Sequence, residues 1–493
     1  MTVELRSFQK ELVDKLGTPR IPARLIGDDC GLGKTYEGSA IDKQLRDGTD
    51  TLHTGPGRFR MTLIIAPRSV HEKWRDVLLE FMPHARVIII NRKDRWPFIH
   101  AAVNGEASHL ICHYEAMRLM PQLKKVRFFH ILLDETHRIK NRKTQQTRAI
   151  KQLKTHYKTS MSGTPADDKP EDLWSTLNFL YPGQFRGYWP FVNAVCQVTS
   201  GTIGQTQKTF KKVDGMKKIL DTRGEPTEEL DPVALARFHE MIRPFYMRRL
   251  KEDVLDDLPE KYYSQMYVDL SPTQQKVYDQ LVRDMLAWIG EHEDEPLSVP
   301  VVIAQLVRLQ QCSLGHLEWH TLPSGVEKIR ITEPSSKLDE LFHFIKDEGL
   351  CKRGRNGAIN PIVQFSNSVS YTQLVTRRLT AEGLRVAEMT GATPDWQRDA
   401  MMREFQAGQY DVWAGTIKTG GESIDLFRAS TVTFSDRAWN PSKNKQAEDR
   451  LHRMGQKNAV HVVDFMARDT VDLRVRGTNI RKWSNLRAMF GDK

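Results

Sequence analysis

Short apolar runs alternate with segments of helical periodicity along most of the chain. Helical periodicity is clear at residues 70–81 and 145–153, each of which lies between two apolar runs. Because alternating strands and helices form a parallel sheet covered by helices, the pattern predicts an α/β fold. The second half repeats the alternation, so we expect two such lobes. The predicted strands are residues 63–66, 87–90, 110–112, 131–133 and 158–161, then 362–365, 385–389, 412–414, 432–435 and 460–465.

The pattern changes between the two lobes. Residues 186 to about 245 are polar and contain several glycines, and they end in a predicted helix over 232–242. Residues 271–311 are rich in Gln and Leu and predict further helices. These segments are expected to be additions to the two lobes.

Composition restricts the class of protein. The chain has 493 residues, of which 39% are hydrophobic and 27% charged. No run approaches the roughly 18 apolar residues of a membrane span, and the N-terminus has no signal-peptide pattern. The 5 cysteines are scattered, without the spacing of a metal site or a disulfide framework, which favours a reducing compartment. The net charge of +11 and pI near 9.3 suit a protein that binds a phosphate backbone, although other basic proteins share them.

The first candidate site is the segment Asp28–Thr35, with sequence DDCGLGKT, which follows a short apolar run. Gly31 and Gly33 allow backbone N–H groups to close around phosphate oxygens. Lys34 is placed to reach the outer phosphates, and Thr35 to bind Mg²⁺. The strict phosphate-loop pattern is missed, because Asp28 occupies the position of its first glycine. A glycine-rich turn that binds no nucleotide is the alternative.

Two carboxylates end an apolar run at residues 129–133. Ligands of parallel sheets bind where such strands end. We therefore expect Asp134 to hold Mg²⁺ and Glu135 to orient and deprotonate the attacking water. An ordinary strand followed by an acidic helix cap is the alternative, and it is weakened by the phosphate loop about 100 residues upstream.

Two more blocks complete the candidate chemistry. Ser162-Gly163-Thr164-Pro165 places hydroxyl groups at a predicted turn after a strand, which by itself is also typical of an ordinary turn. Near the C-terminus, Trp439-Asn440-Pro441 precedes the segment from Gln446 to Gln456. Arg450 and Arg453 are three residues apart, so on a helix both guanidinium groups face one anionic target, such as a nucleotide triphosphate. The alternative is a solvated basic helix.

The order of these blocks resembles superfamily-two helicase motors, and further segments narrow the resemblance to the Swi/Snf family of double-stranded-DNA translocases. It covers nearly the whole chain. The further segments are Leu5–Lys10, Ala66–Ser69 with Trp74, Arg138–Asn141, Leu173–Leu180, Arg248–Val254, Leu270–Pro272, Ser336–Leu338 and Gly420–Gly421.

The resemblance implies two RecA-like lobes with helical protrusions between them. Residues 1–185 would form the ATP-binding lobe and 336–475 the second lobe. Residues 186–250 and 251–335 would hold the protrusions and the lobe junction, and 476–493 a C-terminal helix.

Residue roles also follow from the resemblance. Gln9 would contact adenine, and Asp28 would belong to the nucleotide-binding loop. Coupling between ATP and DNA would involve His137, Ser162, Thr164 and Gln446. DNA contacts would come from the 113–115 turn and from Pro67, Arg68, Ser69, Ser366, Thr416, Lys418, Gly420, Gly421 and Trp439.

A few positions depart from the family pattern. Thr136 stands where alanine is usual, and Cys30 replaces a frequent methionine. Glu422 and Asp425 make the Gly-Gly motif unusually acidic, which affects the expected DNA contacts more than the ATP contacts. None of these changes removes a catalytic group.

The leading hypothesis is a DNA-dependent ATPase that uses ATP and Mg²⁺ and translocates on duplex or branched DNA without sequence specificity. The segment from Gln446 to Arg450 resembles the fork-remodelling and annealing branch of the family. A strand-separating helicase, a motor subunit of a larger complex and a binding module with a vestigial ATPase are the alternatives. The compact size favours a bacterial or viral protein acting in the cytoplasm, with no membrane partner.

Overall fold

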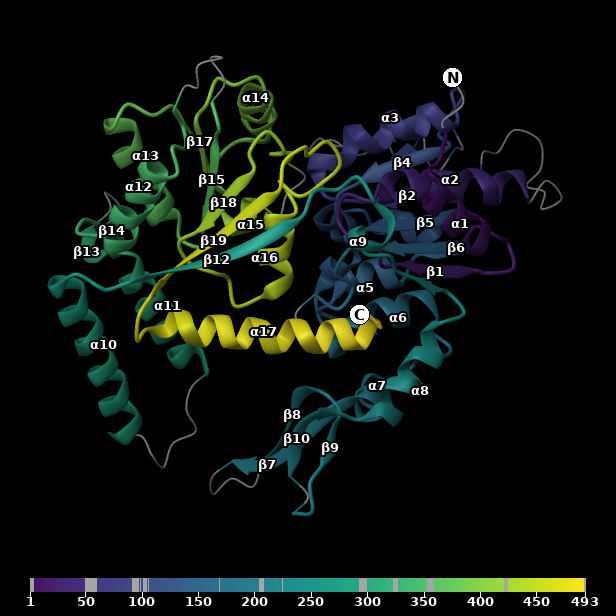
Figure 1. Cartoon of the computed structure of the whole chain (residues 1–493). Helices are drawn as coiled ribbons and strands as arrows, with labels where there is room; N and C mark the ends of the chain where they lie inside the picture. The colour runs from purple at the N-terminus through teal and green to yellow at the C-terminus, as the bar shows by residue number, and fades with distance from the viewer. Residues whose placement is uncertain are drawn as a thin grey trace. The chain divides into compact units, whose positions relative to one another are not determined.

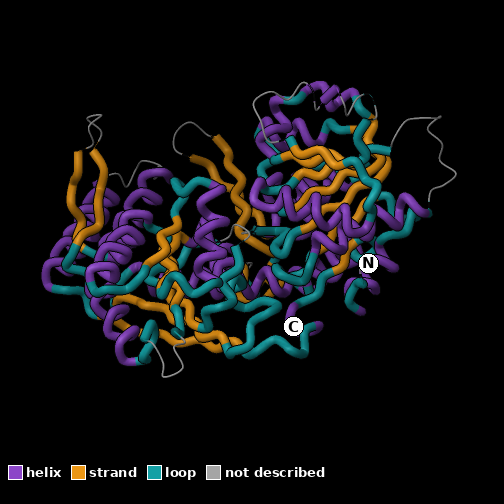
Figure 2. Tube along the Cα trace, turned by 90° about the horizontal axis from the view of Figure 1, so that it is seen from above, coloured by secondary structure: helices purple, strands orange, loops and turns teal. Residues whose placement is uncertain are grey.

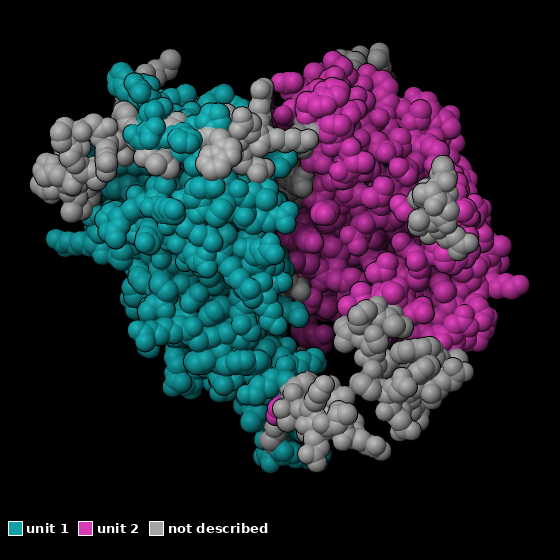
Figure 3. Space-filling model, turned by 180° about the vertical axis from the view of Figure 1, so that it is seen from behind, with its two compact units in different colours: residues 1–199, 211–256, 484–493 teal, residues 200–210, 257–483 magenta. Residues whose placement is uncertain are grey.

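The computed structural model divides the chain into two compact units (Figure 3). Unit 1 comprises residues 1–199, 211–256 and 484–493, and unit 2 comprises residues 200–210 and 257–483. The structure describes residues 4–48, 60–90, 97, 99–100, 104, 106–167, 169–203, 208–223, 225–291, 299–321, 327–352, 359–420 and 424–491. Within these ranges, no helix has both the length and the apolar character needed to cross a bilayer.

Unit 1 is built on a seven-stranded parallel sheet with the order β11-β1-β6-β5-β2-β4-β3 (Figure 1). Its central strands are buried along nearly their whole length, as expected for a sheet covered on both faces. The strands are β1 (Ala23–Ile26), β2 (Thr62–Ile65), β3 (Val87–Ile89), β4 (His109–Cys112), β5 (Arg127–Asp134), β6 (Lys154–Met161) and β11 (Tyr246–Met247).

Helices cover this sheet. One core cluster joins Leu12, Ile41 and Trp74 to Ile64 and Leu132 of the sheet, so the first three helices pack on the same face. The helices of the unit are α1 (Ser7–Leu16), α2 (Lys34–Asp47), α3 (His71–Phe81), α5 (Gln145–Lys151), α6 (Leu173–Leu180), α7 (Tyr188–Val195), α8 (Pro232–Ile242) and α9 (Lys251–Val254).

The segment expected to be a helical protrusion, residues 186–250, is only partly helical. Between α7 and α8 it forms two small sheets, one of β7 (Cys196–Ile203) with β8 (Lys208–Met216) and one of the antiparallel strands β9 (Lys218–Leu220) and β10 (Pro226–Leu230). Several β-branched Thr and Val residues and the glycines favour strands and turns here over helix. Helix α8 has the expected bounds, because the Asp231 side chain caps the N–H groups of Val233 and Ala234 and Pro232 starts the helix.

Unit 2 contains a six-stranded parallel sheet with the order β12-β19-β18-β15-β17-β16. Strands and helices of both units can be followed by colour in Figure 2. The strands are β12 (Lys261–Val268), β15 (Ile362–Ser366), β16 (Val386–Met389), β17 (Val412–Thr416), β18 (Thr431–Phe434) and β19 (Val460–Ala467), and β13 (His316–Thr321) and β14 (Glu327–Thr332) form a separate antiparallel pair. The helices are α10 (Pro272–Glu291), α11 (Val299–Leu314), α12 (Ser336–Asp347), α13 (Val369–Ala381), α14 (Asp395–Gln406), α15 (Ile417–Gly420), α16 (Pro441–Glu448) and α17 (Val471–Phe490), of which residues 484–490 are counted with unit 1.

None of the 5 cysteines forms a disulfide. Cys112 and Cys196 are buried in unit 1 and Cys312 is buried in unit 2, whereas Cys30 and Cys351 are partly exposed. Burial raises the pKa of Cys112 and of Cys312 to about 12. These thiols are therefore protonated and unreactive as long as they stay buried.

Candidate active site

The phosphate loop lies between β1 and α2, as the sequence predicts. Gly31 and Gly33 both have positive φ angles, 94° and 90°, which glycine adopts without strain. Lys34 begins α2 and its Nζ atom donates to the carbonyl oxygens of Asp28 and Asp29, at 2.7 and 3.1 Å. Burial lowers the pKa of Lys34, but nearby negative groups outweigh it and the pKa is raised. Lys34 is therefore a permanent cation at the N-terminus of a helix, which is the electrostatic setting for a bound phosphate.

Gln9 lies directly against this loop. Its Nε2 atom donates to the Leu32 carbonyl at 2.9 Å, and its Oε1 atom accepts from the Arg6 backbone N–H at 3.1 Å. A Cβ atom at Gly33 would come within 2.4 Å of Gln9 Nε2. The contact brings helix α1 and the phosphate loop together, so a role for Gln9 near the base of a nucleotide fits the geometry and stays a prediction.

The structure explains why an aspartate can replace the first glycine of the loop. The Asp28 side chain is fully buried and pairs with the guanidinium group of Arg249, which also bonds Glu37 Oε1 at 2.9 Å. Arg249 donates as well to the carbonyl oxygen of Phe8. Asp28 thus contacts the loop through its backbone carbonyl, while its carboxylate faces a buried arginine. In the sequence, Arg249 stands out only as part of the Arg248–Val254 segment, because sequence spacing does not reveal its partners.

Glu37 is the second carboxylate of this buried cluster. Burial raises its pKa well above the ordinary value, the charge of Asp28 raises it further, and the charge of Arg249 only partly opposes the shift. The two buried carboxyl groups therefore share one guanidinium, and the raised pKa of Glu37 reduces the negative charge that this buried site has to hold.

Asp134 ends β5 at the edge of the sheet where the phosphate loop lies. Its Oδ2 atom accepts from the indole Nε1 of Trp74 at 2.9 Å, and its carbonyl oxygen accepts from the Tyr114 hydroxyl at 2.7 Å. Burial raises the pKa of Asp134 to about 6, the charge of Glu135 adds to this, and the Trp74 hydrogen bond opposes it. Trp74, which the resemblance groups with a DNA-contact motif, is fully buried against the Asp134 carboxylate and does not face solvent.

The expected coupling residues of unit 1 form one hydrogen-bonded group. Glu135 has a φ angle of 55°, unusual for a side-chain-bearing residue, and its Oε2 atom accepts from Ser162 Oγ at 3.2 Å. His137 Nδ1 shares a hydrogen bond of 3.2 Å with Ser162 Oγ, which also accepts from the Thr164 backbone N–H. Thr136 fits where alanine is usual, with its hydroxyl 3.3 Å from that of Thr176. The Ser-Gly-Thr turn therefore contacts the segment that carries Asp134 and Glu135 directly.

The donor set fits Mg²⁺. Mg²⁺ is usually held by one or two carboxylates together with hydroxyl groups, waters and substrate phosphates. Asp134 and Thr35 supply a carboxylate and a hydroxyl beside the loop, and no cluster of three or more His, Cys, Asp or Glu side chains that could hold a metal occurs in the described part of the chain. A nucleotide would have to complete such a site.

The expected DNA contacts of unit 1 lie at the surface. Arg68 and Ser69 are exposed and Pro67 is partly exposed, in a 3₁₀ turn (Arg68–Val70) just before α3. The Arg68 guanidinium lies 2.9 Å from His113 Nε2. The two segments expected to contact DNA are thus joined to each other.

The two predicted arginine fingers belong to unit 2, and their local structure differs from the expectation. Helix α16 ends at Glu448, so Arg450 and Arg453 lie in the turns that follow it and not on one helix face. Arg450 Nε donates to the Gly420 carbonyl at 2.7 Å, and Arg453 pairs with Asp425. The acidic character of the Gly-Gly motif therefore provides a partner for Arg453.

A buried ion-pair group anchors the end of α16. Glu448 Oε2 lies 3.0 Å from Lys261 Nζ, and Glu448 Oε1 lies 2.6 Å from Arg437 Nη1. Arg437 also binds Asp464 at 2.6 Å. Burial opposes ionisation, but the charges of Lys261 and Arg437 dominate and lower the pKa of Glu448 to about 2.

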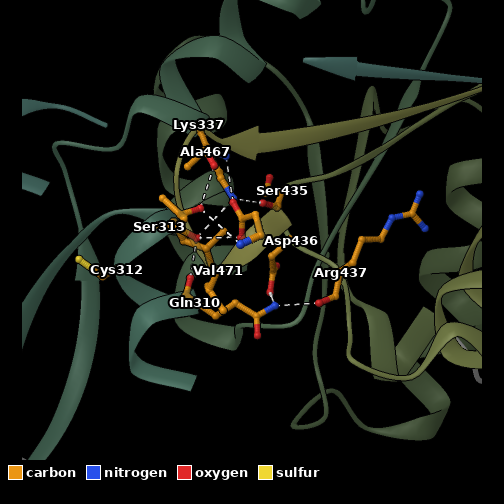
Figure 4. Close-up of polar contacts among 12 residues, drawn as sticks. Gln310, Cys312, Ser313, Lys337, Ser435, Asp436, Arg437, Ala467 and Val471 are labelled. Atoms are coloured by element: carbon orange, nitrogen blue, oxygen red, sulfur yellow. Dashed lines mark hydrogen bonds and ion pairs between the residues drawn. The ribbon is translucent and has the colours of Figure 1, made fainter. Parts of the chain in front are cut away.

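Ser366 is turned inward. It is fully buried and its hydroxyl donates to Asp436 at 2.6 Å. Asp436 also accepts from Gln310, which donates in addition to the Arg437 carbonyl (Figure 4). Next to this group, the fully buried Lys337 donates to the Ser435 carbonyl and to Asp472, at 2.7 and 2.5 Å.

The other expected contacts of unit 2 differ in exposure. Lys418 is exposed, whereas Thr416 and Gly420 are buried; Gln446, expected to couple ATP to DNA, is also buried. Trp439 is partly buried and packs against a core cluster that contains Tyr278 and Leu309. Gly421 and Glu422 lie outside the described residues. Of this group, Lys418 has the exposure that a direct phosphate contact needs, and all the DNA contacts stay predictions.

Two family models match the chain. The model of the SNF2-related domain matches residues 18–314, which is more than half of the chain, and the model of the helicase conserved C-terminal domain matches residues 337–455. The chain belongs to the SNF2-related family. It is a helicase-like ATP hydrolase, and the expected pair of RecA-like lobes is confirmed.

Named relatives agree with this assignment. The chain is similar to TATA-binding protein-associated factor BTAF1 of Arabidopsis thaliana (26% identity, 96% of this chain and 25% of the relative). It is also similar to TATA-binding protein-associated factor 172 of Homo sapiens (27%, 97% and 27%) and to transcription regulatory protein SNF2 of Saccharomyces cerevisiae (26%, 91% and 25%). This SNF2-family chain thus spans about a quarter of the length of these curated relatives. Among solved structures, it is similar to the Sulfolobus solfataricus SWI2/SNF2 ATPase core in complex with dsDNA, with 23% identity over 99% of this chain and 97% of that chain and a TM-score of 0.44.

The expectation of a bacterial or viral cytoplasmic protein is wrong. The curated relatives are eukaryotic, and one of them is named nuclear protein STH1/NPS1. The expectation rested on the compact size of the chain, which carries no information about source or compartment.

Proposed function

We propose that this SNF2-family ATPase requires Mg²⁺, is stimulated by DNA and translocates on duplex DNA. One observation carries the proposal. The acidic pair Asp134–Glu135 lies beside the phosphate loop, because Ser162 Oγ donates to Glu135 at 3.2 Å and a Cβ atom at the next residue, Gly163, would lie 2.8 Å from Cys30 Sγ of the loop. A cation for the phosphates and a carboxylate pair for the metal and the water therefore share one site.

The residues of unit 1 would divide the reaction as follows. Lys34 exchanges the carbonyl oxygens of Asp28 and Asp29 for the outer phosphates, and Asp134 and Thr35 hold Mg²⁺, which neutralises developing charge when bound. Glu135 orients the attacking water and accepts its proton. Because Ser162 already binds Glu135 and His137, a shift of the Ser-Gly-Thr turn would alter the position of the base.

Arg450 and Arg453 would complete the site from unit 2. To reach the γ-phosphate, they would exchange their present contacts with the Gly420 carbonyl and Asp425 for phosphate oxygens. In related NTPases an arginine supplied in this way contributes roughly 10³–10⁵ in rate. Hydrolysis would then depend on both units acting together.

DNA is the proposed partner because the chain is basic and exposes Arg68, Ser69 and Lys418 within the motifs expected to contact it. These side chains bind phosphate oxygens well, and the sequence carries no motif typical of base-edge recognition, so binding would be insensitive to sequence and sensitive to salt.

Steady-state ATP hydrolysis without DNA and with single-stranded, duplex and forked DNA tests the proposal. Lys34→Ala serves as the blank, and Lys43→Ala is its matched control, since Lys43 lies on the same helix with an exposed side chain paired to Asp47. Stimulation by duplex or forked DNA above that by single strands supports a translocase. Stimulation mainly by single strands favours the strand-separating helicase, and an absence of hydrolysis in every condition overturns the proposal for this chain on its own.

A further inference from the structure

Two buried aromatic side chains hold Asp134 from opposite ends. The indole of Trp74 donates to the carboxylate at 2.9 Å, and the hydroxyl of Tyr114 donates to the backbone carbonyl of the same residue at 2.7 Å. Both aromatic side chains are fully buried. Asp134 thus has its side chain and its main chain fixed by two separate segments of unit 1.

Each donor belongs to a segment that also carries an expected DNA contact. Trp74 lies in α3, one turn after the exposed residues Arg68 and Ser69. Tyr114 follows His113 at the end of β4. The Arg68–His113 contact of 2.9 Å joins the two segments, so a shift of one is transmitted to the other.

The Trp74 ring is held in place by packing. A Cβ atom at Gly38 of α2 would lie 2.8 Å from the Trp74 ring and 3.2 Å from the Leu132 side chain, so only glycine leaves room for the indole there. Glycine inside a helix costs about 1 kcal/mol relative to alanine. Gly38 therefore weakens α2 slightly but leaves room for the indole between α2 and the sheet.

We propose that Trp74 and Tyr114 are positioning residues that couple DNA at the surface of unit 1 to the metal-binding carboxylate of Asp134. This inference rests on the proposed function, because it requires Mg²⁺ at Asp134 and DNA near Arg68. DNA contact fixes the two segments, and their hydrogen bonds fix the orientation of the carboxylate. Partners of metal ligands commonly change metal affinity 10–100-fold when they are removed.

Binding of a fluorescent ADP analogue, measured with Mg²⁺ and with EDTA, tests the first half of the proposal in the full chain. Trp74→Phe keeps most of the ring volume and removes the N–H donor, and Tyr114→Phe removes only the hydroxyl. Both variants should bind the analogue in EDTA within about twofold of the wild type and lose about tenfold of the affinity gained from Mg²⁺. Trp413→Phe is the control, because Trp413 is fully buried in unit 2 and its indole nitrogen has no hydrogen-bond partner among the described residues.

Repeating the titrations with saturating duplex DNA tests the coupling. In the wild type DNA should strengthen Mg²⁺-dependent binding, and by linkage Mg²⁺–nucleotide should strengthen DNA binding by the same factor. In Trp74→Phe both effects should fall towards unity, while DNA affinity without nucleotide is retained.

Three outcomes overturn the proposal in distinguishable ways. Equal losses in Mg²⁺ and in EDTA would assign the aromatic side chains a purely structural role. A full Mg²⁺ gain in both variants would show that they do not orient Asp134. If wild-type binding of the analogue responds to neither Mg²⁺ nor DNA, the proposed function itself fails, and the inference fails with it.

Discussion

Replacement of Arg249 by methionine should destabilise unit 1 more than the loss of any surface ion pair. Arg249 is buried and is the cationic partner of Asp28 and Glu37, which are both fully buried. Methionine fills a similar volume but leaves the Asp28 carboxylate without its partner. Breaking a buried pair from one side typically costs about 3–5 kcal/mol, a large part of the roughly 5–15 kcal/mol that stabilises a folded domain.

The loss of stability caused by Arg249→Met should increase as the pH rises. Glu37 already has a raised pKa, and the loss of the guanidinium should raise it further. A group with a raised pKa in the folded state destabilises the fold as pH rises above its unfolded value, about 4.3 for glutamate. The variant should therefore be closest to the wild type near pH 4 and furthest from it at neutral pH.

Urea unfolding followed by circular dichroism measures the change, and hydrogen exchange of peptides covering residues 23–47 locates it in β1 and α2. Arg75→Met is the control, since Arg75 pairs with Glu72 and Asp76 at the surface, where such pairs contribute about 0–1 kcal/mol. If Arg249→Met costs no more than Arg75→Met, or if its effect is independent of pH, the buried cluster does not stabilise the loop as argued.

Two further predictions concern the nucleotide site and the buried ion pairs of unit 2. Lys34→Ala should abolish binding of ATP, whereas Arg453→Ala should leave ATP affinity largely intact and lower kcat by roughly 10³ or more; equal losses of affinity in nucleotide titrations would contradict the assignment. Because neighbouring cations lower the pKa of Glu448 to about 2, the contribution of Glu448 to the stability of unit 2 should be fully present above about pH 4.3 and should decline as pH falls towards 2. Glu448→Gln should remove this part of the acid dependence in a pH titration of unfolding, and an unchanged acid limb would show that the buried ion pairs contribute little.

The sheets were predictable from sequence because parallel strands covered by helices read as continuous apolar runs. Strand β5 is buried over seven of its eight residues and was found, whereas β12 was missed. Strand β12 lies at the edge of its sheet and exposes Tyr262, Tyr263 and Tyr267, so its apolar signal is weak.

The candidate site was predictable to the level of motifs but not of contacts. Local patterns identify Lys34 and Asp134, because the chemistry demands those residue types at the ends of strands. The partners that fix them come from far along the chain: Arg249 lies 221 residues from Asp28, and Trp74 lies 60 residues from Asp134. The end of α16 at Glu448 was also not predicted, because the arginine spacing that suggests a helix is equally compatible with consecutive turns.

Each unit contains a buried cysteine whose rate of modification by a thiol reagent can report how often that unit opens. Cys112 is closed inside unit 1 and Cys312 inside unit 2, each with a thiol that only opening of its surroundings can ionise. After the partly exposed Cys30 and Cys351 have been blocked, the rate at which a thiol reagent reaches each buried sulfur reports how often that unit opens. Nucleotide or DNA that tightens one unit and leaves the other unchanged would slow one of these rates alone, so the native sequence can reveal which half of the motor a ligand stabilises without an added label.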